Sequence, residues 1–210
     1  MSEYHKIQTL FKRDMSSKQK TLIEGDWTLP EFEYLASNVW TFTEKVDGTN
    51  IRVIFKDGGV KFCGRTDDAQ ISAQLVTRLN ERFLPLAQKL GEVFADGSVV
   101  LYGEGYGAKI QKGGGNYRAD QDFVLFDIRV GSFWLQRADV EEMAQKLDLD
   151  IVPVIGEGTL YDAVAQAKAG IQSTWGCFQA EGIVARPKVE LNTRSGHRLI
   201  AKIKCRDFIA

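Results

Sequence analysis

The chain has 210 residues with 44% hydrophobic content, and its formal net charge is −1. That length and composition can fill the core of one domain, or at most of two small lobes. The near-neutral charge excludes a protein that binds nucleic acid over its whole surface. No apolar run reaches the roughly 18 residues of a membrane span, and we expect no secretion signal. Three cysteines without metal-ligand spacing favour a reduced, cytoplasmic chain, and the composition gives no reason to expect more than a monomer.

The first half of the chain contains a predicted hairpin followed by a predicted helix. Residues 51–56 and 60–65 are β-rich runs, and the intervening Asp57-Gly58-Gly59 is typical of a tight turn. Apolar residues recur at helical spacing through 71–90, and Pro85 is expected to kink or break this helix.

The second half of the chain mixes further strands and helices. We expect strands at 98–103, 123–129, 183–186 and 198–204, and helices at 138–147 and 159–169. The strands arrive in pairs joined by turns, and the helices are inserted irregularly. This order favours an α+β fold, built on mixed or antiparallel sheets with flanking helices, over a regular βαβ array.

Two features bear on phosphate binding. Residues 185–210 hold seven Lys or Arg and two acids, which fits a local phosphate site and equally fits an ordinary solvated face. Glycine clusters at 103–107 and 113–115 lack the spacing of a dinucleotide fingerprint or a P-loop. Any use of ATP is therefore expected to proceed without a P-loop.

The most informative feature is a series of short motifs that begins at Lys45. The hexapeptide Lys45-Val-Asp-Gly-Thr-Asn50 follows a β-rich aromatic stretch and places one lysine before a tight Asp-Gly turn. Alone this pattern is weak, because Asp-Gly usually just marks a turn. The motifs that follow are Cys63-Gly-Arg65, Gly103-Glu104-Gly, Leu125-Phe126-Asp127, Glu181-Gly-Ile-Val and Lys202-Ile-Lys204. The last two lysines are two residues apart on a predicted strand and so share a face.

This ordered set resembles the covalent nucleotidyltransferases, which comprise RNA ligases, DNA ligases and mRNA capping enzymes. The resemblance covers roughly residues 40–206 and implies a single nucleotidyltransferase (ATP-grasp-like ligase) domain over residues 1–210. The chain is most similar to phage-type RNA ligases of the type-2 branch, since Asn50 stands where DNA ligases and capping enzymes usually carry Arg. Asp47 departs from that branch, which often has His at this position.

The resemblance implies an ATP-dependent RNA ligase that works through a lysyl-AMP intermediate. ATP would donate AMP to Lys45, with Mg²⁺ or Mn²⁺ as the metal. The AMP would then pass to an RNA 5′-phosphate, and a 3′-hydroxyl would displace it, with nicked duplex RNA as the expected substrate. A free lysine amine is almost wholly protonated at neutral pH, and nearby cations favour its neutral form. Lys202, Lys204 and the metal are therefore expected to help activate Lys45.

The resemblance also assigns roles to the remaining site residues. Glu181 is expected to position the metal or Lys45. The expected nucleotide-binding set is Glu44, Asn50, Arg65, Glu104 and Phe126. Within it Glu104 would accept from a ribose hydroxyl, Arg65 would contact a sugar or phosphate, and Phe126 would stack on adenine, although a Phe in an apolar strand is usually core. Asn50 is expected to serve chiefly the nucleic-acid steps. The Lys-x-Lys motif is assigned to Lys202 and Lys204, although Lys204-Cys-Arg206, two residues later, could match it instead.

Three alternatives stay open at the level of sequence. Most relatives carry a further C-terminal domain that orients the nucleic acid, and we expect no separate one here. The chain would then be either a minimal ligase made of the catalytic domain alone or a truncated piece of a longer protein, and an accessory protein could supply the missing grip. A DNA ligase or a capping guanylyltransferase of the same fold would share most of the motifs. A catalytically silent nucleic-acid-binding relative would share the fold without needing all of Lys45, Glu104, Glu181, Lys202 and Lys204.

Overall fold

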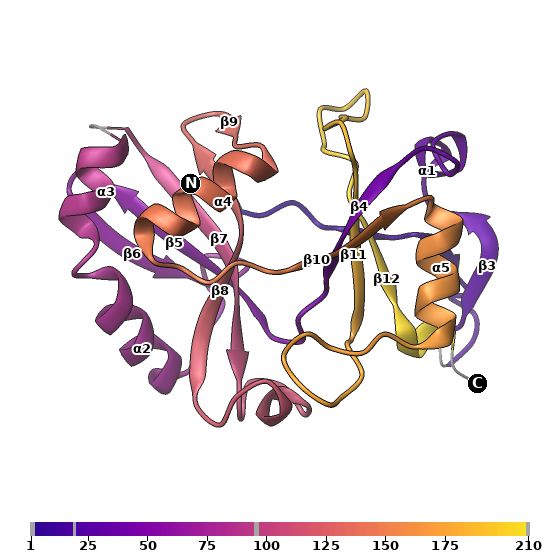
Figure 1. The fold of residues 1–210 in the computed structure, drawn as a ribbon, viewed down its shortest axis with the longest axis horizontal. Helices are drawn as coiled ribbons and strands as arrows, with labels where there is room; N and C mark the ends of the chain where they lie inside the picture. The colour runs from indigo at the N-terminus through magenta and orange to yellow at the C-terminus, as the bar shows by residue number, and fades with distance from the viewer. Residues whose placement is uncertain (1–2, 19, 95–96, 209–210) are drawn as a thin grey trace. The chain divides into compact units, whose positions relative to one another are not determined.

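The structure is a computed structural model that describes residues 3–18, 20–94 and 97–208 (Figure 1). The chain divides into two compact units. The first unit holds Asp47–Val152 with the amino-terminal residues up to Tyr4, and the second holds His5–Val46 and Pro153–Ala210. Lys45 therefore belongs to the second unit, and the Asp-Gly turn that follows it belongs to the first.

The first unit is built on an antiparallel sheet with the strand order β6-β5-β7-β8-β9. The strands are β5 (Thr49–Lys56), β6 (Gly59–Cys63), β7 (Val99–Gly107), β8 (Gln121–Val130) and β9 (Phe133–Trp134). The predicted hairpin is confirmed as β5 and β6. Asp57 and Gly58 at its tip have positive φ values of 50° and 74°, as the common two-residue hairpin turn requires.

Helices cover one face of this sheet. They are α2 (Ala73–Phe83), α3 (Ala87–Phe94) and α4 (Arg137–Leu147), and a short 3₁₀ helix, η1 (Gly114–Asn116), lies in the β7–β8 connection. The Ser72 hydroxyl accepts from the Leu75 amide and caps α2. The predicted break at Pro85 is confirmed, because α2 ends two residues before it. Apolar side chains of all three longer helices share one core with β5, β7 and β8.

The second unit has a mixed sheet with the strand order β1-β12-β11-β4-β10, in which β1 and β12 are parallel and the other pairs are antiparallel. Its strands are β1 (Gln8–Thr9), β4 (Trp40–Glu44), β10 (Val154–Gly158), β11 (Gly182–Pro187) and β12 (Ala201–Lys204). A hairpin of β2 (Phe11–Arg13) and β3 (Leu22–Trp27), helices α1 (Pro30–Tyr34) and α5 (Leu160–Ala169), and the 3₁₀ helix η2 (Cys205–Asp207) complete the unit.

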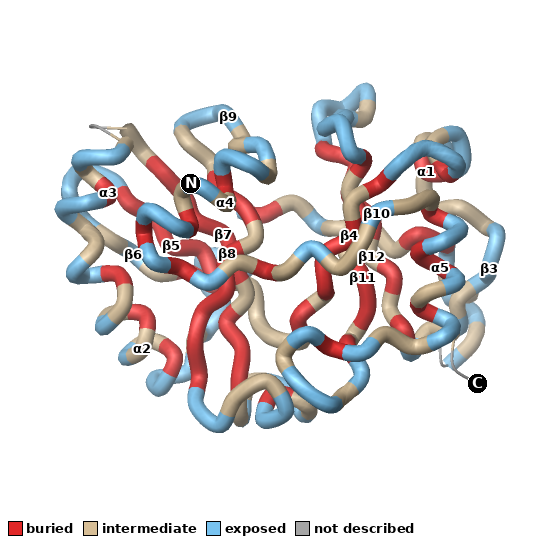
Figure 2. Tube along the Cα trace, in the orientation of Figure 1, coloured by how far each residue is buried: buried red, intermediate tan, exposed pale blue. Residues whose placement is uncertain are grey.

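The predicted elements are present, and several further ones are not visible in the sequence pattern. Strands β1, β2, β3 and β10 and helix α1 were not predicted. Most are short, and β10 is an edge strand that contains two glycines and buries little (Figure 2). Helix α5 begins with a capping box between Thr159 and Asp162. The predicted α+β class with antiparallel and mixed sheets is confirmed. Across the described ranges, no helix is both long and apolar enough to cross a membrane.

Candidate active site

The sheet of the second unit has an apolar face and a basic face, because side chains alternate along each strand. Its apolar residues, which pack against α5, are Trp40, Phe42, Ile183, Ala185, Ala201 and Ile203. The intervening positions of β12 carry Lys202 and Lys204, which are half-buried. Lys45 continues this arrangement one residue beyond β4, since its amide donates to the Gly182 carbonyl at 2.9 Å.

The Glu181 carboxylate joins two of these lysines. Its Oε2 accepts from Nζ of Lys45, and its Oε1 lies 2.6 Å from Nζ of Lys204. Burial opposes ionisation of Glu181, but the two ammonium groups outweigh it and hold the pKa of this carboxyl below its ordinary value. The motifs at residues 45, 181 and 204 therefore meet at one carboxylate. Lys202 lies on the same strand, opposite Val184, whereas Arg206 is exposed in η2 beyond the strand.

Gly182 allows β11 and β12 to approach closely beside this carboxylate. A Cβ at Gly182 would lie 2.0 Å from the Ile203 carbonyl oxygen and 2.8 Å from Cα of Lys204. Both obstacles are backbone atoms, so a side chain here must push the two strands apart. The glycine of the Glu-Gly motif thus keeps Glu181 within reach of Lys204.

We expect Gly182→Ala to destabilise the protein by about 1–3 kcal/mol, the usual cost of overpacking. Denaturant unfolding would measure it. Gly115→Ala is the matched control, because nothing lies within 4 Å of the added methyl group, and it should change stability by less than about 0.5 kcal/mol. Equal effects of the two substitutions would contradict the steric argument.

Glu44 precedes the candidate nucleophile and is fully enclosed by its own unit. Its side chain is 1% exposed. One carboxylate oxygen accepts from the Ser173 hydroxyl at 2.6 Å, and the other accepts from the Thr174 amide and hydroxyl, both at 2.9 Å. Ser173 and Thr174 were not singled out from the sequence, where no motif marks them. They fix the end of β4 and hence the start of the Lys45 motif.

In the first unit, Asn50 and Glu104 lie directly opposite each other on β5 and β7. Gly48 makes this approach possible, because a Cβ there would lie 2.3 Å from the Gly105 carbonyl oxygen and 2.7 Å from Cγ of Glu104. Within the described part of the chain, the buried Oδ1 of Asn50 has no hydrogen-bond partner. An unsatisfied buried acceptor is unusual in proteins, and a polar ligand group would satisfy it.

Arg65 is exposed two residues beyond the end of β6. A second arginine, Arg52, was not singled out from the sequence and contacts the residues around Arg65. Arg52 is completely buried. Its Nε donates to the Gly64 carbonyl at 2.8 Å, and its guanidinium lies 2.7 Å from Oδ1 of Asp67. The sequence signal that could have identified Arg52 is its position as a charged residue within the apolar run of β5. Arg52 thus contacts the chain on both sides of Arg65, through the Gly64 carbonyl and the Asp67 carboxylate.

Phe126 sits at a β-bulge. Tyr102 pairs with Asp127 and Gly103 with Leu125, so Phe126 is an extra residue on β8 without a partner on β7. Its ring is half-buried and meets Tyr4 edge-on at 5.1 Å, while the Tyr4 hydroxyl donates to Asp127 at 2.9 Å. Simple alternation predicts that Phe126 and Asp127 point to opposite faces. That prediction is wrong at the bulge, which re-aims side chains, because both reach Tyr4.

The family of the chain follows from comparison with known proteins. A family model described as RNA ligase matches residues 38–204. The chain belongs to the RNA ligase family. No curated protein sequence matches it. The matched segment of this RNA ligase family member runs from just before β4 to the end of β12, so it contains the predicted site residues of both units.

Solved structures of similar fold include mutants of an RNA ligase from Naegleria gruberi. One with AMP and Mn is 20% identical, with a TM-score of 0.63 over 96% of this chain and 57% of that one. Another with AMP and Mn is 19% identical, with a TM-score of 0.65 and the same coverage. A third, with ATP and Mn, is 21% identical, with a TM-score of 0.63 over 84% of this chain and 52% of that one. At this identity the likeness establishes the fold, and the chain spans a little over half the length of these ligases.

The side chains that could bind a divalent metal ion in this RNA ligase family member are carboxylates. No group of three or more His, Cys, Asp or Glu side chains within residues 3–18, 20–94 and 97–208 is arranged to hold an ion. Magnesium is usually bound by one or two carboxylates together with substrate phosphates. Glu181 fits that pattern, because each of its oxygens has acceptor capacity beyond its lysine contact.

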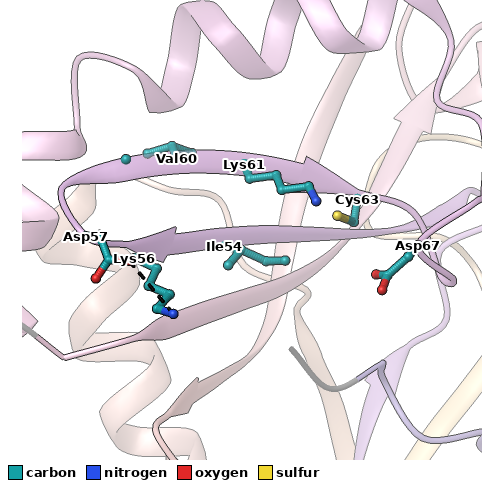
Figure 3. A pocket seen from close by; sticks show the side chains of 8 residues that line it. Ile54, Lys56, Asp57, Val60, Lys61, Cys63 and Asp67 are labelled. Atoms are coloured by element: carbon teal, nitrogen blue, oxygen red, sulfur yellow. Dashed lines mark ion pairs between the residues drawn. The ribbon is translucent and has the colours of Figure 1, made fainter.

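A pocket of about 470 Å³ lies on the β5–β6 hairpin (Figure 3). It is lined by Ile54, Lys56, Asp57, Gly59, Val60, Lys61, Cys63 and Asp67. Lys56 pairs with Asp57 at 3.8 Å, and Asp67 pairs with Arg52. Lys56, Asp57 and Asp67 are therefore paired with neighbours, and none of the predicted site residues lines the pocket.

The lowered pKa of Glu181 gives a testable pH dependence. A carboxyl whose pKa is lower in the folded than in the unfolded chain adds stability above its unfolded value, near 4.5, and loses it as the pH falls through the folded value. We expect the stability difference between the parent and Glu181→Gln to be largest near neutral pH and to shrink below about pH 4.5. Urea unfolding of both proteins across pH 3–7 would measure it, and a constant difference would contradict it.

Proposed function

We propose that this protein is an ATP-dependent RNA ligase that forms a lysyl-AMP intermediate on Lys45. The observation that carries the proposal is the convergence of Lys45 and Lys204 on opposite oxygens of Glu181, in a chain of the RNA ligase family. Attack on a phosphate requires a nucleophile, a group that orients it and positive charge that stabilises the phosphate. Here these are the half-buried Lys45, the Glu181 carboxylate and Lys204.

In the proposed first step Nζ of Lys45 attacks the α-phosphorus of ATP. The Lys45 ammonium group first loses one proton to solvent and becomes the amine nucleophile. The N–P bond then forms as the P–O bond to pyrophosphate breaks, and a second proton leaves the nitrogen for solvent. Glu181 orients Nζ through the hydrogen bond it accepts. Lys204 and Lys202 offset the negative charge that the phosphates bring, and charge fixed in advance is the most effective form of such stabilisation. Glu181 would also be the protein ligand of a magnesium or manganese ion, which would neutralise phosphate charge when bound.

The proposed nucleotide and RNA contacts come from the first unit, whereas the enclosed Glu44 is proposed to act indirectly, by fixing the strand end that precedes Lys45. Glu104 is proposed to accept from a ribose hydroxyl, and Phe126 to stack on the adenine. The exposed Arg65 is proposed to contact a sugar or phosphate of the nucleotide. Asn50, with its unsatisfied Oδ1, is proposed to serve chiefly the nucleic-acid steps. In the first of those steps AMP is transferred from Lys45 to an RNA 5′-phosphate. In the second, an RNA 3′-hydroxyl attacks that phosphate and releases AMP, which joins the two RNA ends. The enzyme is proposed to be a monomer.

The covalent step is tested by intact-protein mass after incubation with ATP and Mg²⁺. We expect the parent to gain the mass of one AMP and the Lys45→Ala protein to gain none. The purified adduct should then seal a nick in duplex RNA without added ATP. No adduct with ATP would overturn the proposal.

The second candidate is a capping-type guanylyltransferase or a DNA ligase of the same fold, because these share the Lys-x-Asp-Gly motif. Parallel incubations with GTP and with nicked DNA separate these functions. Labelling by GTP in preference to ATP would favour the capping reaction, and preferential sealing of DNA would favour a DNA ligase.

A further inference from the structure

The loop between β7 and β8 binds the backbone of the turn that follows Lys45. The Asp47 amide donates to the Tyr117 hydroxyl oxygen at 3.1 Å. Nε2 of Gln111 donates to the Gly48 carbonyl at 3.0 Å. All four residues lie in the first unit, and the two partners are more than sixty residues away in sequence. Side chains of this loop therefore satisfy the amide of Asp47 and the carbonyl of Gly48, two successive residues of the Lys45 motif.

Close contacts within the loop hold its two ends together. A Cβ at Gly114 would lie 2.0 Å from the Gly107 carbonyl oxygen, so the backbone at Gly114 packs directly against the residue at which the loop begins. The Ala108 amide donates to the carbonyls of Arg118 and Asp120 at 3.2 and 3.1 Å. The Ala108 carbonyl in turn accepts from Gln121 at 2.8 Å. These bonds close the two ends of the loop on each other.

A charged and aromatic cluster anchors the loop beside Tyr117. The Tyr117 ring meets Tyr106 at 6.0 Å and an angle of 86°, and the Arg118 guanidinium lies 5.8 Å above the Tyr106 ring. Arg118 also contacts the buried Asp122 at 2.6 Å. Arg78 and Arg82 of α2 bind the same carboxylate at 3.1 and 2.9 Å. A continuous series of contacts thus runs from helix α2 to the Asp47 amide.

We propose that Tyr117 and Gln111 are positioning residues for Lys45, acting through the backbone of the Asp47–Gly48 turn. This inference rests on the proposed function, since the direction of a lysine matters to the reaction only if that lysine attacks. The Lys45 amide is fixed by Gly182 on one side, and the two loop side chains fix the chain on the other. Misplacement of a reacting group by about 1 Å can slow a reaction on the order of 10²-fold.

The test is the single-turnover rate of lysyl-AMP formation in Tyr117→Phe, measured over a range of ATP concentrations. This substitution removes the hydroxyl acceptor and keeps the ring against Tyr106. We expect the maximal rate to fall about 3- to 10-fold, the equivalent of one ordinary hydrogen bond, with an unchanged half-saturating ATP concentration. Adding Gln111→Met should lower the rate further. Tyr34→Phe is the matched control, because Tyr34 is 86% exposed.

Amide hydrogen exchange at Asp47 supplies a readout that does not depend on activity. We expect protection of this amide to fall in Tyr117→Phe and to persist in Tyr34→Phe. An unchanged maximal rate, an effect confined to the ATP concentration dependence, or unchanged protection would overturn the positioning role. A parent protein that forms no lysyl-AMP would overturn the proposed function instead, and the exchange experiment would still decide whether Tyr117 holds the turn.

Discussion

Lys45→Arg is expected to abolish lysyl-AMP formation while leaving the ion pair with Glu181 in place. Arginine keeps the positive charge and can still donate to the carboxylate, but its guanidinium stays protonated at any accessible pH and has no lone pair for attack. Removal of a catalytic nucleophile can cost on the order of 10⁶-fold in rate. We therefore expect labelling by ATP to fall at least about 10³-fold, as measured by intact-protein mass over time.

Lys204→Arg is the matched control for this experiment. Lys204 contacts the same carboxylate, at 2.6 Å, and receives the same substitution. If its contribution is positive charge, Lys204→Arg should keep labelling within about tenfold of the parent. Loss of labelling in Lys204→Arg with retention in Lys45→Arg would move the nucleophile to Lys204. Retention in both would place the adduct elsewhere.

The contrast between these two lysines also separates the enzyme from a silent relative. A protein that only binds nucleic acid needs the charge of Lys45, and arginine supplies that charge as well as lysine does. Binding of RNA should therefore survive in the Lys45→Arg protein. If Lys45 is the nucleophile, the Lys45→Arg protein should lose lysyl-AMP formation and still bind RNA.

Local chemistry made much of the fold predictable. The β5–β6 hairpin follows from Asp57-Gly58, whose positive φ values suit these two residue types. The break between α2 and α3 follows from Pro85, which cannot continue a helix. The elements that were missed owe their form to tertiary contacts. Helix α1 is only five residues long and carries one buried side chain, Phe32, so its sequence has no helical stripe to read.

The sequence predicted which motifs belong to the candidate site, but not how their side chains are arranged and contacted. Resemblance placed Lys45, Glu181 and Lys204 together, and strand pairing shows how they meet. Three features could not be read from the chain. The bulge at Phe126 breaks the two-residue period on which strand predictions rest. Glu44 depends on Ser173, about 130 residues later, and the Asp47 amide on Tyr117, 70 residues later. Such contacts leave no periodic or spacing signal.

The arginine cluster around the buried Asp122 carboxylate was equally invisible, since each arginine looks like an ordinary surface charge in its own segment. Arg78 and Arg82 occupy adjacent turns of α2, and Arg118 belongs to the β7–β8 loop. All three converge on Asp122, which is 2% exposed. Burial opposes ionisation of Asp122, but the arginines and the amide of the next residue hold the pKa of its carboxyl below its ordinary value.

Asp122→Asn is therefore expected to destabilise the protein strongly, although the two side chains have almost the same shape. It removes one charge and leaves three guanidinium groups around a neutral amide. Breaking a buried ion pair by removing one partner commonly costs about 3–5 kcal/mol, and we expect a loss in that range by urea unfolding. The effect should weaken in acid, where the parent carboxyl also becomes neutral.

Asp120→Asn is the control that isolates burial from charge. Asp120 pairs with the same Arg118, but its side chain is 60% exposed, and surface pairs contribute about 0–1 kcal/mol. Equal losses in the two proteins would show that the Asp122 cluster adds no more stability than a surface pair. If the losses differ as expected, Asp122→Asn should also lower protection of the Asp47 amide at denaturant concentrations where the chain remains folded. That result would connect helix α2 with the turn beside Lys45, because Arg118 and Tyr117 lie between them on the same loop.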